Sequence, residues 1–280
     1  MLRQTWGSVV CPSCNNLVGV NDERCYNCGR WNPGLWGFAP LLHRLGRDLG
    51  FTPFVIWACV ILFLLSLVMD PGGMRMGGIL NLFSPSIESL FVFGASGAIP
   101  VFEYGRWWTV LSAGWLHGSV LHIFFNMMAL RQLAPATAEL YGASRMIIIY
   151  TAGTVAGFTA SSVAALLRMP LTGAGFTVGA SAAIFGLLGA LIYYGRRSGS
   201  TMVSDQAKGW VFSMFVLGFL IPAIDNWAHL GGLAGGYLAS KILDPLYPER
   251  LDHFIIALIC LALTAVAVVF SVVHGLSLLR

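Results

Sequence analysis

The length of the apolar segments constrains the fold of this chain more than any other feature. Apolar residues gather in blocks of about 17 to 25, the length with which an α-helix crosses a hydrocarbon core roughly 30 Å thick. Hydrophobic residues make up 57% of the 280 residues and charged residues only 10%, a balance that a water-soluble fold could not bury. We therefore predict an all-α polytopic membrane protein with seven spans, at about 54–69, 119–133, 146–167, 177–194, 209–224, 227–243 and 254–273.

The positions of the Lys and Arg residues predict the orientation of these spans. With the N-terminus placed in the cytoplasm, all but four of the 16 basic residues fall on the cytoplasmic side, as the positive-inside rule requires. Residues 1–30 lack the apolar core of a cleavable signal peptide, so we expect this N-terminus to be retained. A bacterial inner membrane is the expected location. The net charge of +4 is not gathered into a basic run, and we expect no nucleic-acid partner.

Composition divides the chain into four parts. Residues 1–32 are polar and rich in Cys, and residues 33–50 form a linker of Pro, Gly and aromatic residues that ends in a basic stretch. Residues 51–245 hold six of the predicted spans, and residues 246–280 add a seventh, C-terminal one. Between the first two spans, a segment of mixed polarity with several Trp residues is predicted to be a long structured loop in the membrane interface.

The N-terminal cysteines have the spacing of a metal site. Cys11, Cys14, Cys25 and Cys28 follow the pattern C-x2-C-x10-C-x2-C, in which each pair presents two thiolates from one tight turn. Four sulfur ligands suit a tetrahedral Zn²⁺ ion, so we predict a structural zinc in a small zinc-ribbon-like domain of unknown partner. Disulfides or a redox role are the alternative, which a reducing cytoplasm disfavours. A closed four-cysteine site leaves no ligand position for catalysis, for which we expect no cofactor.

A few polar residues lie inside the predicted spans, where such groups are costly and commonly mark function. Taken singly, a buried Ser can bond to its own helix and a membrane His can be purely structural. However, in the predicted orientation the second, fourth and sixth spans all start at the outer face and carry these residues in their first halves. A nucleophile, a base and further hydrogen-bond donors at one depth form the arrangement that acyl transfer needs. The residues are His122, Asn126, Ser181, Asp225 and His229, with His117 just before the second span.

The order and spacing of these motifs resemble the rhomboid family of intramembrane serine proteases over roughly residues 50–245. The seventh span is similar to the 6+1 form of that family, so the resemblance implies a bundle of six transmembrane helices plus one C-terminal helix. The cysteine unit resembles a domain added to some members. The motifs are His117-x4-His122-x3-Asn126, Gly179-Ala180-Ser181, and Ala228-His229-Leu230-Gly231-Gly232 followed by Gly236.

This resemblance implies a serine endopeptidase that cuts single-pass transmembrane proteins within the lipid bilayer. Ser181 is then the nucleophile and His229 the general base, in a dyad without a third acid. The oxyanion is bound by His122, Asn126 and the backbone N–H of Ser181. Phe185 occupies the position where an aromatic ring packs on the catalytic His. The supporting residues are His117, Gly179, Phe185, Gly232 and Gly236.

The sequence departs from the family pattern at two positions. Ala182 stands where the family has Gly after the nucleophile, so a methyl group neighbours Ser181. Thr109 stands where the family has Arg, while Arg106 lies three residues earlier. A literal G-x-S-G at 94–97 lies in the outer loop, and we interpret it as unrelated to catalysis. Asp225 is expected to cap a helix.

Two other functions stay open at the level of sequence. A catalytically inactive relative that binds membrane proteins would usually have lost Ser181 or His229, and only Ala182 favours this hypothesis. A transporter or channel would line its pathway with the buried His and Asn residues. That function predicts paired broken helices in repeated halves, and the sequence has no such internal symmetry.

Overall fold

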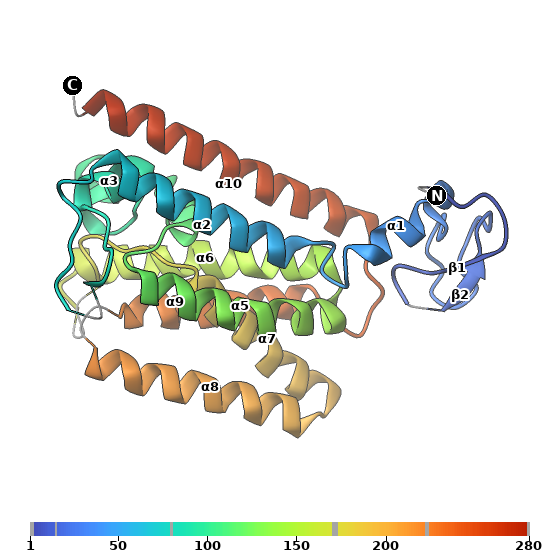
Figure 1. Ribbon diagram of the computed structural model, residues 1–280. Coiled ribbons are helices and arrows are strands. Elements are labelled where there is room, and N and C mark those ends of the chain that lie inside the picture. The colour runs from blue at the N-terminus through green and yellow to red at the C-terminus, as the bar shows by residue number, and fades with distance from the viewer. Residues whose placement is uncertain (1–2, 15, 79–80, 170–172, 222–223, 279–280) are drawn as a thin grey trace.

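Long helices dominate the computed structural model, which describes residues 3–14, 16–78, 81–169, 173–221 and 224–278. Figure 1 shows these helices side by side, with the N-terminal unit at one end of the bundle and α3 at the other. Each long helix overlaps one predicted span, although α8 begins eight residues before its span and α5 ends eight residues after its span. The prediction of an all-α polytopic protein is confirmed. The helices are α2 (Phe51–Met69), α5 (Val120–Tyr141), α6 (Ala143–Leu166), α7 (Ser181–Ser198), α8 (Thr201–Leu220), α9 (Asn226–Ile242) and α10 (Leu251–Leu278).

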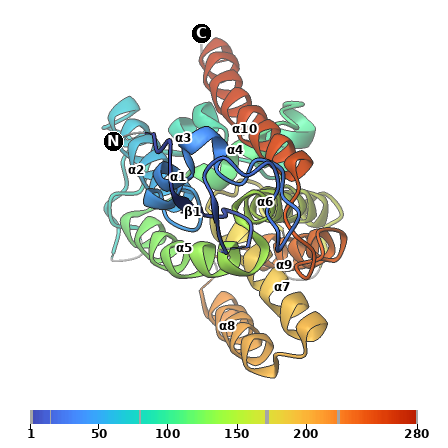
Figure 2. The same ribbon diagram turned by 90° about the vertical axis from the view of Figure 1, so that its right-hand side faces the viewer.

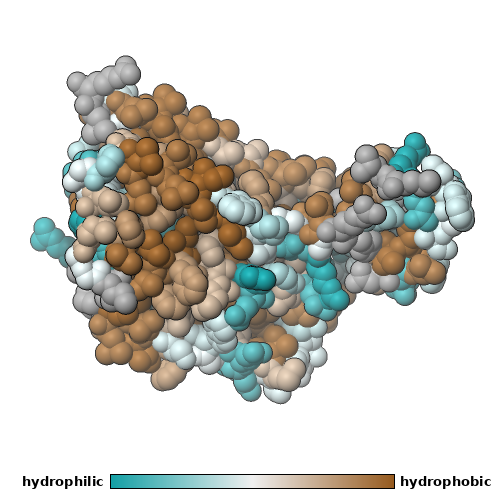
Figure 3. All heavy atoms as spheres, viewed as in Figure 1, coloured by the Kyte–Doolittle hydropathy of each residue, from teal (hydrophilic) through white to brown (hydrophobic). Residues whose placement is uncertain are grey.

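The apolar surface of the bundle identifies an integral membrane protein. Among the described residues, α2, α6 and α10 are each long and apolar enough to cross a membrane. Large apolar side chains on the outside, such as Trp57 of α2 and Val266 of α10, are more than half exposed at 66% and 63%. Figure 3 shows this hydrophobic surface over the bundle and a hydrophilic band where the bundle faces the N-terminal unit.

Helix α7 lies at the centre of the bundle, against α5, α6, α8 and α9. Most of its residues from Ala182 to Gly195 are buried, so this helix contacts protein where the outer helices contact lipid. A central helix can therefore carry polar residues that a lipid-facing helix could not. By contrast, α8 packs mainly on α7 and lies at the edge of the bundle (Figure 2).

The segment between α2 and α5 contains short helices where the sequence predicted a structured loop. The hydroxyl of Ser86 caps the first of them by accepting a hydrogen bond from the Ser89 N–H at 3.1 Å. Ser96, in the G-x-S-G segment, pairs through its backbone with Thr177, just before α7. This outer segment therefore contacts the residues that precede Ser181. The helices whose bounds lie wholly within its described residues are α3 (Ile87–Phe93), η3 (Ile99–Glu103), α4 (Thr109–Ser112) and η4 (Ala113–Trp115).

Arg106 ties the outer segment to α10. Its side chain is fully buried and donates hydrogen bonds to the carbonyl oxygens of Phe91 at 2.5 Å and Ser271 at 2.8 Å. The Thr109 hydroxyl donates to the Arg106 carbonyl at 2.7 Å. The guanidinium of Arg106 therefore has a structural role, because it joins the outer segment to α10.

The N-terminal unit has a small core of its own. Strands β1 (Ser8–Val10) and β2 (Leu17–Gly19) pair antiparallel, with Val9 opposite Val18. Both valines are buried together with Cys11 and Cys25. The chain then continues through η1 (Leu35–Gly37) and α1 (Ala39–Arg44) to α2.

Candidate active site

Ser181 is the first residue of α7, four residues later than the predicted start of the fourth span. Its backbone N–H is therefore one of the helix N-terminal groups that have no partner within the helix. The preceding Gly179 has φ +132°, a conformation that L side chains rarely adopt. The positive end of the helix dipole and a free N–H thus lie beside the Ser181 hydroxyl, where a developing negative charge would be stabilised.

The space beside Gly179 brings Ser181 and His122 together. A Cβ atom at position 179 would lie 2.6 Å from His122 Nε2 and 3.7 Å from Ser181 Oγ. Only glycine leaves this space open, so the imidazole of His122 and the hydroxyl of Ser181 border on the same small volume. This gap lies at the Gly179 Cα, between the two side chains.

His122 is held with Nε2 facing that gap. Its Nδ1 accepts a hydrogen bond from the Gly118 N–H at 3.3 Å, so in the neutral ring the proton lies on Nε2, which becomes the donor. His117 packs its buried ring edge-on against His122, with 5.2 Å between ring centroids. Ser119 caps α5 by accepting from the His122 N–H at 3.3 Å. These contacts fix the orientation of the ring.

Asn126 lies one turn further along α5. Its Nδ2 donates to the His122 carbonyl at 2.8 Å, which uses one of its two N–H groups and leaves the second available. The residue is only 7% exposed. His122 and Asn126 therefore share one face of α5, as their spacing predicted.

His229 reaches the site from the first turn of α9. Its ring stacks on Phe185, with centroids 4.1 Å apart and planes 11° apart. Phe185 follows Ser181 by four residues, so the two lie on one face of α7. The stacking therefore holds His229 over the face of α7 that carries Ser181. No hydrogen bond joins the Ser181 hydroxyl to the His229 ring among the described residues, which is common where substrate is absent.

No carboxylate contacts the far side of His229. Within the described chain, His229 Nδ1 is buried and has no hydrogen-bond partner. Asp225, the nearest acid in the sequence, accepts from the Ala228 N–H at 2.9 Å and from the Ser161 hydroxyl. The expected role of Asp225 as a helix cap is confirmed.

Small residues let α9 approach α7 closely. A Cβ at Gly232 would collide with the Ala182 carbonyl, and one at Gly236 would collide with the Gly186 backbone. The predicted close packing at these two glycines is confirmed. It places His229, one turn before Gly232, beside the start of α7.

The methyl group of Ala182 points away from the site. Successive residues on a helix differ in direction by about 100°, and Ala182 is buried beside Phe158 and Ala228. A Cβ at Gly157 of α6 would lie 2.7 Å from the Ala182 Cβ. Gly157 therefore provides the room for this methyl between α6 and α9, and the Ser181 hydroxyl stays open.

The sequence analysis did not identify two contributors to the site. Gly157 belongs to a pair with Gly153, whose Cβ would lie 2.8 Å from the Gly186 Cα. The four-residue spacing of these glycines is the same signal that marked Gly232 and Gly236. Phe215 of α8 faces the His229 ring edge-on with centroids 6.5 Å apart. The sequence gives no comparable signal for Phe215, because apolar residues cover α8 without a clear face.

The four N-terminal cysteines form a cluster that can hold a metal ion. All four Sγ atoms lie within 4.8 Å of one another, with Cys11 and Cys28 at 3.8 Å and Cys14 and Cys25 at 3.5 Å. Four sulfurs around an ion at about 2.3 Å lie about 3.8 Å apart, so the geometry fits, and none of these thiols is disulfide-bonded. Burial raises the pKa of Cys28 to about 12, whereas at Cys14 hydrogen bonds outweigh burial and lower the pKa to about 6.

Comparison with known proteins identifies relatives of the helical part. A Rhomboid domain matches residues 104–246, just over half of the chain. "Rhomboid protease GluP" of Bacillus subtilis (strain 168) is 33% identical over 163 residues, which are 57% of this chain and 30% of that protein. "RHOMBOID-like protein 4" of Arabidopsis thaliana is 31% identical over 166 residues, 58% of this chain and 40% of that protein. The "Putative rhomboid protease YdcA" of Bacillus subtilis (strain 168) is 29% identical over 139 residues, 49% of this chain and 67% of that protein. The matched part thus spans less than half of the first two relatives.

Proposed function

The chain belongs to the rhomboid family, and on that premise we propose that it is an intramembrane serine endopeptidase that cuts transmembrane segments of other membrane proteins. Two of its relatives are named rhomboid proteases. The observation that carries the proposal is the stacking of His229 on Phe185 at 4.1 Å, one helical turn from Ser181. This contact supports a role for His229 as the base of Ser181, whose hydroxyl also borders on the space beside His122.

In the proposed reaction, the Ser181 hydroxyl attacks the scissile carbonyl while its proton passes to His229. The resulting imidazolium gives the proton to the leaving amine, and the C–N bond breaks to leave an acyl-enzyme. Water then attacks the ester with His229 again as the base, which releases the second product and restores the Ser181 hydroxyl. No cofactor takes part in these steps.

The negative charge that forms on the carbonyl oxygen needs donors within the membrane. We assign this role to His122 Nε2–H, the free N–H of Asn126 and the backbone N–H of Ser181. The open space beside Gly179 supports the assignment, because it adjoins both Ser181 Oγ and His122 Nε2. Donors of this kind each contribute about 10²- to 10³-fold to the rate.

A catalytically inactive relative is the alternative function. Its only support was the methyl group of Ala182. Because this methyl packs toward Gly157 of α6, it leaves the serine hydroxyl accessible, and the active enzyme is the better-supported proposal.

The remaining assignments concern the molecule in its membrane. We place the N-terminus in the cytoplasm and the site near the outer face of a bacterial inner membrane. The domains are 1–32, a linker at 33–50, the protease core at 51–245 and the added helix at 246–280. Substrates are single transmembrane segments that unwind near the outer face and enter beside α8.

The cysteine cluster is proposed to hold a structural zinc ion. Cys11, Cys14, Cys25 and Cys28 would supply four thiolates and close the coordination shell. A closed shell activates no water, so the ion would stabilise the fold of the N-terminal unit.

The test is cleavage of a generic transmembrane substrate by the purified protein in liposomes. Wild type should cut, and Ser181→Ala and His229→Ala should each lose at least about 10³-fold in rate. Ser96→Ala is the matched control, because it removes the serine of the other G-x-S-G segment and keeps the backbone pairing of Ser96 with Thr177. Equal cleavage by the wild type and both site variants, or loss of cleavage in Ser96→Ala alone, would refute the proposal.

A further inference from the structure

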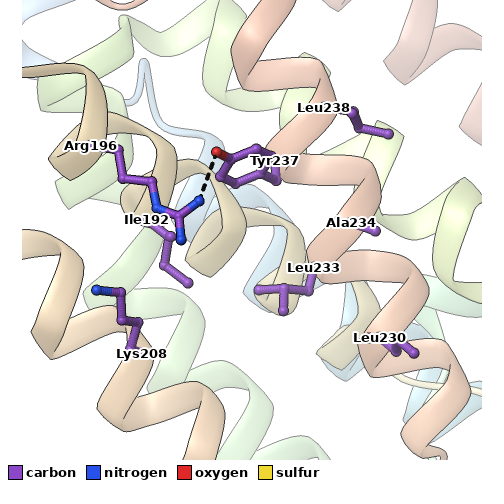
Figure 4. A pocket seen from close by; sticks show the side chains of 8 residues that line it. All are labelled: Ile192, Arg196, Lys208, Leu230, Leu233, Ala234, Tyr237 and Leu238. Atoms are coloured by element: carbon purple, nitrogen blue, oxygen red, sulfur yellow. Dashed lines mark hydrogen bonds between the residues drawn. The ribbon is translucent and has the colours of Figure 1, made fainter.

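A groove lies between α7, α8 and α9, and neither Ser181 nor His229 lines it (Figure 4). Its volume is about 500 Å³, and its wall along α9 is formed by Leu230, Leu233, Ala234 and Leu238. Leu230 and Leu238 are 44% and 60% exposed. In a bilayer, the hydrocarbon chains of lipids would contact such a wall.

Two cationic side chains stand on one side of the groove. Figure 4 shows Arg196 from α7 and Lys208 from α8 on one side of the space and the leucines of α9 on the other. Arg196 Nη1 donates to the Tyr237 hydroxyl at 3.2 Å, and this contact turns the guanidinium toward the groove. Arg196 has no carboxylate partner among the described residues.

Lys208 forms only an exposed ion pair with a neighbouring residue of its own helix. Its Nζ lies 2.8 Å from Asp205 Oδ1, in a pair whose side chains are 50% and 68% exposed. Exposed pairs of this kind contribute little and exchange readily for other partners. This side of the groove therefore carries net positive charge, opposite the apolar wall of α9.

The dimensions of the groove favour one kind of occupant. From Leu230 to Leu238, α9 rises about 12 Å, the length of part of an acyl chain. A slender apolar chain with an anionic head satisfies both the shape and the charge.

We propose that this groove binds an anionic phospholipid, with its phosphate between Arg196 and Lys208 and an acyl chain along Leu230, Ala234 and Leu238. Basic residues at the edge of a membrane span favour anionic headgroups over zwitterionic ones. A lipid there also ties α8 to α9, which touch each other far less than each touches α7.

Lipid binding is tested on the Ser181→Ala protein, so that the result does not depend on the proposed protease activity. The probes are dioleoylphosphatidylglycerol and dioleoylphosphatidylcholine, titrated into the detergent-solubilised full chain and followed by native mass spectrometry. We expect the anionic lipid to bind the starting protein more tightly. Replacing both cations, in Arg196→Gln/Lys208→Gln, should weaken its binding about tenfold or more.

Two further variants test whether the lipid binds in the groove itself or only responds to the overall positive charge of the protein. Arg131→Gln/Lys241→Gln removes the same charge from exposed positions outside the groove and should bind as before. Ala234→Trp keeps both cations but fills the groove, and it should also lose the lipid.

Three results would overturn the proposal. The first is equal binding of the two lipids, and the second is an equal loss in the Arg131/Lys241 control. The third is unchanged binding in Ala234→Trp, which would place the lipid outside the groove. The same double change in the protein that keeps Ser181 should leave the KM for substrate unchanged in purely zwitterionic membranes; a raised KM there would instead make the groove a substrate site and would also overturn the proposal.

Discussion

At the scale of single residues, the turn before Ser181 leaves almost no room for substitution. Gly179 combines a positive φ with a close approach to His122, and each property by itself favours glycine. Ala182, one residue after the nucleophile, lies in the packed layer between helices. A substitution of Gly179 would therefore disturb the proposed site, whereas one of Ala182 would disturb the packing between helices.

Gly179→Ala should remove activity without unfolding the bundle. The added Cβ would lie 2.6 Å from His122 Nε2 and displace this donor, which should lower kcat by about 100-fold or more. Gly199→Ala is the control, because Gly199 also has a positive φ but has nothing within 4 Å of the added Cβ. Equal activity of the two variants in a cleavage assay would show that His122 does not contribute through this gap.

Ala182→Gly should lower stability and leave activity per folded molecule unchanged. It removes a buried methyl that fills space beside Gly157 and places a glycine in a helix, at a cost of about 1 kcal/mol or more. The measurements are the thermal midpoint in detergent and cleavage normalised to folded protein. Ala190→Gly, at another fully buried position of α7, controls for helix propensity. A tenfold gain in activity specific to Ala182→Gly would mean that the methyl crowds the nucleophile.

At the scale of helices, the existence of seven long helices could be predicted because apolar blocks of membrane length have one physical explanation. Their ends could not be predicted. For example, the chain before Ser181 is fixed by the backbone pairing of Thr177 with Ser96, 81 residues earlier. The short helices between α2 and α5 also depend on distant contacts, chiefly those of Arg106 with α10. No local pattern encodes such contacts.

The outer segment should depend on α10 for its stability. Ser271 Oγ accepts from Trp108 Nε1 at 3.1 Å and lies against Gly94. Ser271→Leu should therefore overpack this contact, at a cost of order 1–3 kcal/mol, and expose residues 87–112 to limited proteolysis. Ser277→Leu makes the same change on an exposed face of α10 and should have no effect. Similar protease resistance in both variants would argue against this docking.

At the scale of the whole molecule, the candidate site could be predicted better than the parts that support it. Ser181, His229, His122 and Asn126 stood out because polar groups are rare inside spans. The residues that position them are ordinary packing residues, such as Phe215 and Gly157, whose roles depend on helix register. The four cysteines were visible in the sequence because their spacing alone defines the cluster.

Metal loss should unfold the N-terminal unit and leave the bundle intact. Cys11→Ser/Cys14→Ser should reduce zinc from about one ion per chain to none, because two thiolates remain. Elemental analysis and proteolysis of residues 1–32 measure the effect. Cys260→Ser, outside the cluster, should keep the metal. Retention of zinc in the double variant would place the ion elsewhere.

The proposed protease function depends most on Ser181 being a nucleophile that His229 activates. A fluorophosphonate probe that acylates activated serines, followed by peptide mass spectrometry, measures this without any substrate. We predict one adduct, on Ser181, in wild type and none in His229→Ala. An adduct on another serine, such as Ser96, or equal labelling of Ser181 in His229→Ala, would contradict the account.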